Sequence, residues 1–117
     1  MKLLITGGTG FLGKNLINVL RPKANLLIIS RKNNKSHYKK INFIKSDFNI
    51  SKSNLKKIKK FNPEILIHLG WENIPNYTIK NSNKNLKDQK IFFKKIFKLK
   101  VLKKIIVTGS CSEKKNK

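Results

Sequence analysis

Acidic residues are scarce in this 117-residue chain, which has five Asp and Glu against 28 Lys and Arg. Cysteine is almost absent: Cys111 stands alone, so no disulfide can form within the chain and we expect a reducing compartment. No apolar run approaches the roughly 18 residues that a membrane span requires, and no signal-peptide pattern opens the chain. These absences predict one compact cytoplasmic domain with no membrane partner.

The excess of basic residues gives a formal net charge of +23, which is typical of proteins that bind nucleic acids. However, 26 of the 28 basic residues are lysines, whereas base readout and bidentate phosphate contacts favour arginine. Lys, Asn and Ile, which all have AT-rich codons, make up 57 of the 117 residues. Codon bias therefore accounts for the charge, and we expect nonspecific attraction to polyanions but no specific nucleic-acid partner.

Only six glycines are present, but several are regularly spaced near the start of the chain. A short apolar run, Leu3 to Thr6, precedes Gly8-x-Gly10-x-x-Gly13 at the opening of an amphipathic segment. This spacing after a strand and before a helix is the dinucleotide-binding fingerprint. Gly7 and Gly8 would allow a turn with positive φ, Gly10 would let the backbone approach a pyrophosphate, and Gly13 would let the helix pack closely on the strand. The free N–H groups at the helix start would face the phosphates.

The glycine segment also carries a resemblance to a known family. It reads Thr6-Gly7-Gly8-Thr9-Gly10-Phe11-Leu12-Gly13, a TGxxGxxG form that resembles the short-chain dehydrogenase/reductase superfamily. More narrowly, it is similar to the extended branch, the NAD-dependent epimerases and dehydratases that act on nucleotide sugars. The resemblance implies an NAD(P) cofactor contacted by Gly7, Gly10, Phe11, Leu12 and Gly13.

Apolar runs between breakers predict five buried strands, over 3–6, 25–30, 41–44, 64–69 and 104–108. Helices are expected after the glycine loop, after a cap at Ser51 or Ser53, and over 82–99, whereas 31–40 is expected to be a loop. This alternation predicts an α/β fold, a Rossmann-type doubly wound parallel sheet, and the resemblance implies the strand order 3-2-1-4-5. The expected domain covers 1–113 and is truncated before the substrate domain, with a basic tail over 114–117.

Within the first helix, apolar residues recur at helical spacing and are expected to face the sheet. They are Leu12, Leu16, Val19 and Leu20. The last helix has an aromatic face around Phe92 and Phe97, and the resemblance implies that this helix contributes to a homodimer interface, of which only half would remain here.

Residues after the second and third strands bear on the choice of cofactor. Ser30-Arg31-Lys32 has two bases and no acid where NAD-binding folds usually carry Asp or Glu, so Arg31 favours NADP over NAD. The alternative is that Arg31 points into solvent. Asp47 follows the third strand, where the resemblance implies an Asp bound to the adenine amino group, with Phe48 lining the same pocket. The alternative for Asp47 is a turn or helix cap.

Further site residues come from the resemblance alone. The segment His68-Leu69-Gly70-Trp71 is similar to the epimerase segment that packs beside the nicotinamide-side ribose, which implies contacts from Leu69 and Gly70. His68 itself is expected to be a neutral core histidine. Asn85 resembles the Asn that supports the proton relay in the superfamily. Gly109-Ser110-Cys111 resembles a Gly-Ser-Cys stretch whose Ser binds the substrate, so Ser110 is the candidate catalytic residue, and we expect no metal site.

The family's catalytic Tyr-x-x-x-Lys motif does not occur in these 117 residues, since neither Tyr38 nor Tyr77 has a Lys four positions on. We therefore expect the NAD(P)-binding part of a sugar-nucleotide epimerase/dehydratase-like oxidoreductase, truncated and without turnover, because a general base would be missing. One alternative is a small noncatalytic dinucleotide-binding module. Another is a basic nucleic-acid binder, which would need sequence-selective affinity that survives moderate salt.

Overall fold

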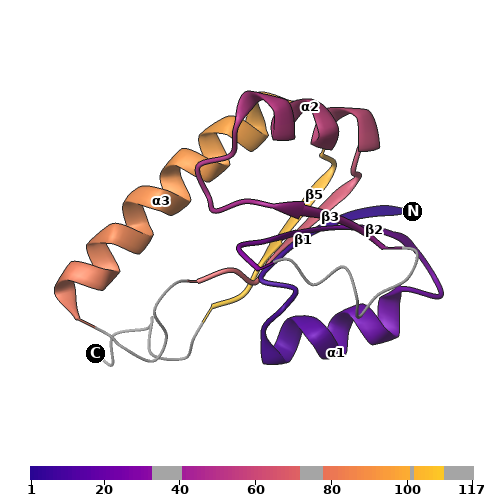
Figure 1. Ribbon diagram of the computed structural model, residues 1–117, viewed down its shortest axis with the longest axis horizontal. Helices are drawn as coiled ribbons and strands as arrows, with labels where there is room; N and C mark the ends of the chain where they lie inside the picture. Colours follow the sequence, from indigo (N-terminus) through magenta and orange to yellow (C-terminus); the bar gives the residue numbers. More distant parts are fainter. Residues whose placement is uncertain (33–40, 72–77, 101, 110–117) are drawn as a thin grey trace.

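The structure, a computed structural model, describes residues 1–32, 41–71, 78–100 and 102–109. Five strands and three helices follow one another along these residues (Figure 1). In chain order they are β1 (Lys2–Thr6), α1 (Phe11–Leu20), β2 (Asn25–Ser30), β3 (Asn42–Lys45), α2 (Lys52–Phe61), β4 (Ile65–His68), α3 (Ile79–Phe97) and β5 (Lys104–Val107).

The strands form one parallel sheet in the order β3-β2-β1-β4-β5. In the register of the central strands, Leu4 of β1 lies between Leu27 of β2 and Leu66 of β4. The predicted fold class and strand order are confirmed. From β1 the chain first adds β2 and β3 on one side, and then returns to add β4 and β5 on the other side of β1. The carboxyl ends of β1 and β4 therefore flank a topological switch point, where open α/β sheets bind ligands.

Helices cover both faces of the sheet, with α1 on one face and α2 and α3 on the other (Figure 1). Successive strand residues point to opposite faces, so the continuous apolar runs supply both sides. The core on the α1 side consists of Leu3, Ile5, Ile17, Leu26 and Ile28. The larger core on the other side includes Leu4, Leu27, Ile29, Leu66, Ile58 of α2, and Phe92 and Ile96 of α3.

The face that α1 turns to the sheet differs in part from the one predicted: Leu20 packs against the core as expected, but Leu12 and Val19 do not. Gly13 and Ile17 are its buried residues, whereas Leu12 and Val19 are 56% and 59% exposed. The physical reason is the close packing at Gly13, because a helix that touches the β1–α1 loop through a glycine is rotated so that the residues beside that glycine point outward.

The starts of the other helices depend on their caps. Ser51, rather than Ser53, caps α2: its Oγ accepts a hydrogen bond from the Asn54 N–H at 3.2 Å. Thr78 Oγ1 likewise accepts from the Asn81 N–H at 3.1 Å, so α3 begins earlier than the predicted residue 82.

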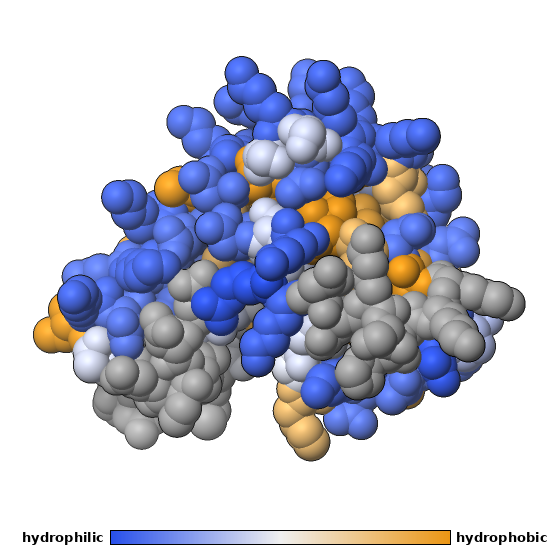
Figure 2. All heavy atoms as spheres, viewed as in Figure 1, coloured by the Kyte–Doolittle hydropathy of each residue, from blue (hydrophilic) through white to orange (hydrophobic). Residues whose placement is uncertain are grey.

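The outside of the molecule is mostly polar, as Figure 2 shows for the face seen in Figure 1, where apolar residues reach the surface only in small patches. The exception in the sheet is β5, an edge strand in which Ile106 and Val107 are 43% and 56% exposed. None of the helices within the described ranges is long and apolar enough to cross a membrane.

Candidate functional site

The site is built around the β1–α1 loop, whose glycines are required by close packing. Gly7 has φ of +70°, and a Cβ on it would lie 2.7 Å from the Gly70 backbone nitrogen, so it suits glycine on both counts. A Cβ on Gly13 would lie 2.3 Å from the Gly7 carbonyl oxygen. At Gly7 and Gly13, therefore, the loop contacts the residues after β4 and the start of α1 with no room for a side chain.

Gly8 does not have the positive φ that was predicted for it. Among the described glycines, only Gly7 has a positive φ. Its reason for being glycine is packing: a Cβ would lie 2.7 Å from Ile28 Cγ2 and 3.0 Å from Ile17 Cδ1. Gly8 thus lets β2 and α1 meet across the loop.

Gly10 differs from the other loop glycines. It is the N-cap of α1 with φ of −76° and ψ of 176°, a conformation that any residue adopts. A Cβ there would meet only the Gly7 carbonyl oxygen, at an ordinary 3.5 Å. The chain's own packing therefore gives no reason for glycine at this position.

The start of α1 also lacks a side-chain cap, unlike α2 and α3, which are capped by Ser51 and Thr78. The first turn of the helix contains no acidic residue. Backbone N–H groups at a helix start carry partial positive charge and favour an anionic partner.

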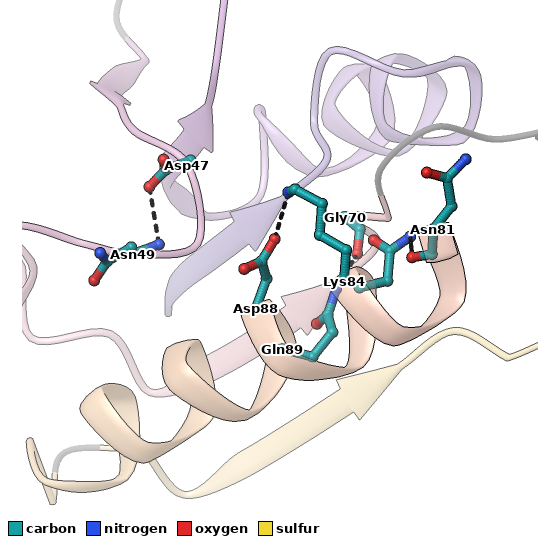
Figure 3. A network of polar contacts seen from close by, with 8 residues as sticks. Asp47, Asn49, Gly70, Asn81, Lys84, Asp88 and Gln89 are labelled. Carbon is teal, nitrogen blue, oxygen red and sulfur yellow. Dashed lines mark hydrogen bonds and ion pairs between the residues drawn. The ribbon is translucent and has the colours of Figure 1, made fainter. Parts of the chain in front are cut away.

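Polar side chains at the ends of β2 and β3 border the same region. Ser30 Oγ lies 3.2 Å from Thr9 Oγ1 and accepts a hydrogen bond from the Lys32 N–H at 3.1 Å. Asp47 Oδ1 accepts from the Asn49 N–H at 2.9 Å, as Figure 3 shows. Asp47 therefore makes the turn that was considered as the alternative to a cofactor contact, and its carboxylate is still exposed beside the loop.

These segments surround a hollow of about 840 Å³ above the carboxyl ends of β1, β2 and β4. It brings together most of the residues predicted to contact a cofactor, although binding itself stays a prediction. They are Gly7, Gly10, Phe11, Leu12, Gly13, Arg31, Asp47, Phe48, Leu69 and Gly70.

Two predicted residues do not join this set. Asn85 is buried in α3, where its Nδ2 donates to the Asn81 carbonyl at 3.0 Å, and it does not line the hollow. Ser110 lies outside the described residues. Within the described ranges, no three His, Cys, Asp or Glu side chains lie close enough together to hold a metal ion.

The hollow also has lining residues that were not named as cofactor contacts: Thr6, Thr9, Ile29, Ser30, Lys32, Ser46 and Trp71. Thr6 is the last residue of β1 and Ser30 the last of β2, while Ser46 directly follows β3. A hydroxyl at the carboxyl end of a strand was therefore a signal available in the sequence. Gln89 was missed as well. It occupies the stripe of α3 that also carries Phe92 and Ile96, and a polar residue on an apolar stripe requires a buried partner.

The partners of Gln89 are His68 and Gly70. Its Oε1 contacts His68 Nε2, and its Nε2 donates to the Gly70 carbonyl at 3.1 Å. On the other side of the ring, His68 Nδ1 lies 2.7 Å from Thr6 Oγ1, which also accepts from the Gly70 N–H at 3.1 Å. Burial lowers the pKa of the His68 imidazole below its ordinary value of 6.5, and the hydrogen bond with Gln89 opposes this shift. The prediction of a satisfied core histidine is confirmed, and the lowered pKa favours the neutral form.

Comparison with known proteins agrees with this geometry. Residues 3–113 match the NAD dependent epimerase/dehydratase family. Curated protein sequences give no significant match. Similar solved structures include an epimerase from Methanothermobacter thermautotrophicus (24% identity, TM-score 0.77, covering 98% of this chain and 37% of that one). Another is the UDP-glucose 4-epimerase of Brucella ovis in complex with NAD (15%, TM-score 0.78, 95% and 36%).

A third similar structure is the UDP-glucose 4-epimerase of Thermotoga maritima with UDP-glucose (18%, TM-score 0.75, 94% and 38%). The chain thus spans between 36% and 38% of the length of these three proteins. At these identities the structural likeness establishes the fold, while the family match extends over nearly the whole chain. On that match, the protein belongs to the NAD-dependent epimerase/dehydratase family.

Proposed function

We propose that this chain binds a dinucleotide, NAD or NADP, in the hollow above β1 and β4, as the cofactor-binding part of a sugar-nucleotide epimerase/dehydratase-like oxidoreductase. The observation that carries the proposal is Gly10. Its dihedral angles and its surroundings would accept a side chain, so the absence of one serves a partner outside the chain. The uncapped start of α1 beside it favours an anion, and a pyrophosphate is the anion that requires such close backbone approach.

The residues around the hollow fit the rest of a dinucleotide. With the pyrophosphate at α1, the adenosine half would lie over the ends of β2 and β3, beside Arg31 and Asp47, and the other half would lie over Leu69 and Gly70 at the exit of β4. Gly70 suits this position because a Cβ there would lie 2.7 Å from the Phe48 ring. When bound, the nicotinamide ring supplies hydride transfer.

Charge at the end of β2 favours NADP. Arg31 and Lys32 both line the hollow, and no acidic residue stands at this strand end to accept the ribose hydroxyls of NAD. A guanidinium is well suited to bind the 2′-phosphate that distinguishes NADP.

We further propose that these 117 residues convert no nucleotide sugar by themselves. Ser110 would orient a substrate oxygen, but removing the hydroxyl proton requires a positioned base, and loss of a general base typically costs about 10²- to 10⁴-fold in rate. The Tyr-x-x-x-Lys motif that would supply it is not in the sequence, and His68 is engaged with Thr6 and Gln89. A small noncatalytic dinucleotide-binding module shares the same site and remains the alternative.

Calorimetric titration of the chain with NAD and NADP tests the proposal. We expect binding of both, tighter for NADP, and a loss of at least about tenfold in affinity in Gly10→Val, whose side chain would enter the space assigned to the pyrophosphate. Arg31→Leu should remove the preference for NADP while leaving NAD affinity within about twofold. Unchanged binding in Gly10→Val would refute the site, and equal or tighter binding of NAD by the unmodified chain would refute the cofactor preference.

The proposed lack of turnover is tested by incubating the purified chain with a nucleotide sugar and NADP. We expect no steady conversion of the sugar. Turnover that disappears in Ser110→Ala would show that the chain contains a base outside the residues considered above.

A further inference from the structure

At the edge of the hollow, buried side chains hold the two peptide groups that flank the Gly70 Cα, called here the Gly70 peptide. The Gly70 N–H donates to Thr6 Oγ1 at 3.1 Å, and the Gly70 carbonyl accepts from Gln89 Nε2 at 3.1 Å. Figure 3 shows Gln89 reaching from α3 to Gly70. Thr6 lines the hollow, whereas Gln89 and His68 are 8% and 4% exposed and lie beneath it, outside its lining.

His68 connects the two side chains that hold Gly70. Gln89 Nε2 donates to the Gly70 carbonyl, so the atom that faces His68 Nε2 is the Gln89 amide oxygen, which can only accept. The proton of a neutral imidazole therefore sits on Nε2, and Nδ1 accepts from the Thr6 hydroxyl, 2.7 Å away. In this arrangement every donor among Thr6, His68 and the Gly70 peptide has an acceptor.

We infer that Gln89 is a positioning residue: together with the neutral His68 it holds the Gly70 peptide where the half of the dinucleotide beyond the pyrophosphate must pack. The inference rests on the proposed function. It assigns no contact between Gln89 and the cofactor, since Gln89 acts through the Gly70 carbonyl and through His68.

The position of Gly70 matters because its backbone is closely packed. A Cβ on Gly7 would lie only 2.7 Å from the Gly70 nitrogen, and a Cβ on Gly70 would lie 2.7 Å from the Phe48 ring. A displaced Gly70 peptide would therefore move into the hollow or against the glycine loop. In the proposed placement, the adenosine half lies over the ends of β2 and β3 and does not pack on Gly70.

Protonation of His68 would disturb the same peptide. An imidazolium donates from both nitrogens, so Nδ1 would become a donor toward Thr6, and the Thr6 hydroxyl hydrogen would lose its acceptor inside the core. Among the described residues, the imidazole's hydrogen bonds and ring contacts are with uncharged side chains: Thr6 on β1, Phe48 in the β3–α2 connection, and Gln89, Phe92 and Phe93 on α3. None of these five compensates a positive charge.

The test compares a whole dinucleotide with its adenosine half. Calorimetry with NAD and with ADP is carried out at about pH 7.5 on the unmodified chain, Gln89→Leu and Gln89→Glu. Gln89→Leu removes both polar contacts, whereas Gln89→Glu keeps an acceptor for His68 and loses the donor to Gly70. We expect both variants to bind NAD about fivefold more weakly, which corresponds to one neutral hydrogen bond, and ADP within about twofold of the unmodified chain.

Asp88→Asn is the matched control. It breaks the 2.7 Å ion pair with Lys84 on the outer side of α3, one residue from Gln89, and should leave both affinities unchanged. Circular dichroism establishes that each variant is folded. If Gln89→Leu does not fold, Gln89→Glu carries the same comparison.

A pH series measures the pH dependence of NAD affinity, which a simple loss of packing would not change. NAD is used because its pyrophosphate diester has no group that titrates between about pH 5.5 and 7.5. We expect NAD affinity of the unmodified chain to fall on acidification across this window, and the dependence to vanish in His68→Gln, which cannot become charged.

Three outcomes would overturn the inference. Equal weakening of NAD and ADP would show that Gln89 supports the fold as a whole, and unchanged affinity for both would show that Gly70 needs no such support. A pH dependence that persists in His68→Gln would remove His68 from the mechanism. Failure of the unmodified chain to bind either ligand is a different result, since it overturns the proposed function and the inference with it.

Discussion

Single residues in the β1–α1 loop separate the needs of folding from those of binding. Gly13 is required by backbone packing, since a Cβ would lie 2.3 Å from the Gly7 carbonyl oxygen, whereas Gly10 has space around it. We predict that Gly13→Ala lowers the free energy of unfolding by about 3 kcal/mol, the upper end for overpacking, because the obstacle is backbone. Gly10→Ala should cost only about 0.5 kcal/mol, the modest effect of replacing glycine at an N-cap. Urea denaturation measures both, and equal losses would contradict this division of roles.

His68 makes stability depend on pH. Its pKa is lowered by burial, so between the folded-state value and 6.5 the unfolded chain binds more protons than the folded one. The free energy of unfolding should therefore fall as the pH drops below about 6.5, by at most about 1.4 kcal/mol per pH unit, and this contribution is fully present above that pH. Denaturation between about pH 5 and 7.5 tests the sign.

Few other groups titrate in this window, because the chain has two histidines and five acids. His68→Gln should flatten the dependence, and His37→Gln, at the other histidine, should preserve it. A flat profile in the unmodified chain would mean that His68 is not held in its neutral form.

At the scale of elements, the starts of α2 and α3 depend on one capping side chain each, whereas α1 starts without one. Ser51 Oγ caps α2, while Ser53 Oγ is only 3.3 Å from Ser51 Oγ and bonds no backbone N–H of the first turn in the described structure. We predict that Ser51→Ala destabilises the chain by about 1 kcal/mol and that Ser53→Ala changes stability by less than about 0.5 kcal/mol. Thermal unfolding compares them, and the reverse order would assign the cap to Ser53.

The second half of α3 is attached to the rest of the molecule by two polar side chains. Gln89 bonds Gly70, and near the end of the helix Lys95 Nζ donates to Asn49 Oδ1 at 2.6 Å and to the Ile50 carbonyl at 2.8 Å. Between them Phe92 is fully buried against Phe48 and His68. The site therefore depends on α3, which supports the exit of β4 and the turn after β3 without lining the hollow.

For the whole molecule, the open edge at β5 is the least protected part of the described structure. Ile106 and Val107 are exposed on the strand, Phe97 is 59% exposed on α3, and a second hollow of about 300 Å³ separates the end of α3 from β5. Unpaired strand edges and apolar patches promote association, while a net charge of +23 opposes it. The homodimer implied by the resemblance stays a prediction.

Because salt screens the repulsion between chains and leaves apolar contacts intact, we predict that oligomers increase between about 0.05 and 0.5 M salt. Sedimentation velocity follows this change. Ile106→Lys should reduce association by placing a charge on the edge, and Val19→Lys, at an apolar position of α1 that is also exposed (59% against 43%), is the control that should not. A single monomeric species at both salt concentrations would contradict the prediction.

The sequence by itself determined the features that depend on neighbours along the chain. Apolar runs such as Asn25–Ser30 located the strands because each run is too short for a helix between its breakers. The glycine spacing identified the loop because a turn, a close approach and a helix start occupy fixed consecutive positions. These two patterns placed the glycine loop at the hollow, since parallel strands deliver their carboxyl ends to one edge of the sheet, whereas Asp47, Phe48, Leu69 and Gly70 came from the family resemblance.

Tertiary structure decided what depends on distances between residues far apart in the chain. Gly8 is glycine because Ile28 and Ile17 approach it, and α1 turns Ile17 rather than Val19 inward because of the contact at Gly13. Thr6, His68 and Gln89 meet across separations of 62 and 21 residues. Local periodicity carries no information about such separations, so only the packed sheet and α3 reveal that a buried histidine and glutamine hold the edge of the site.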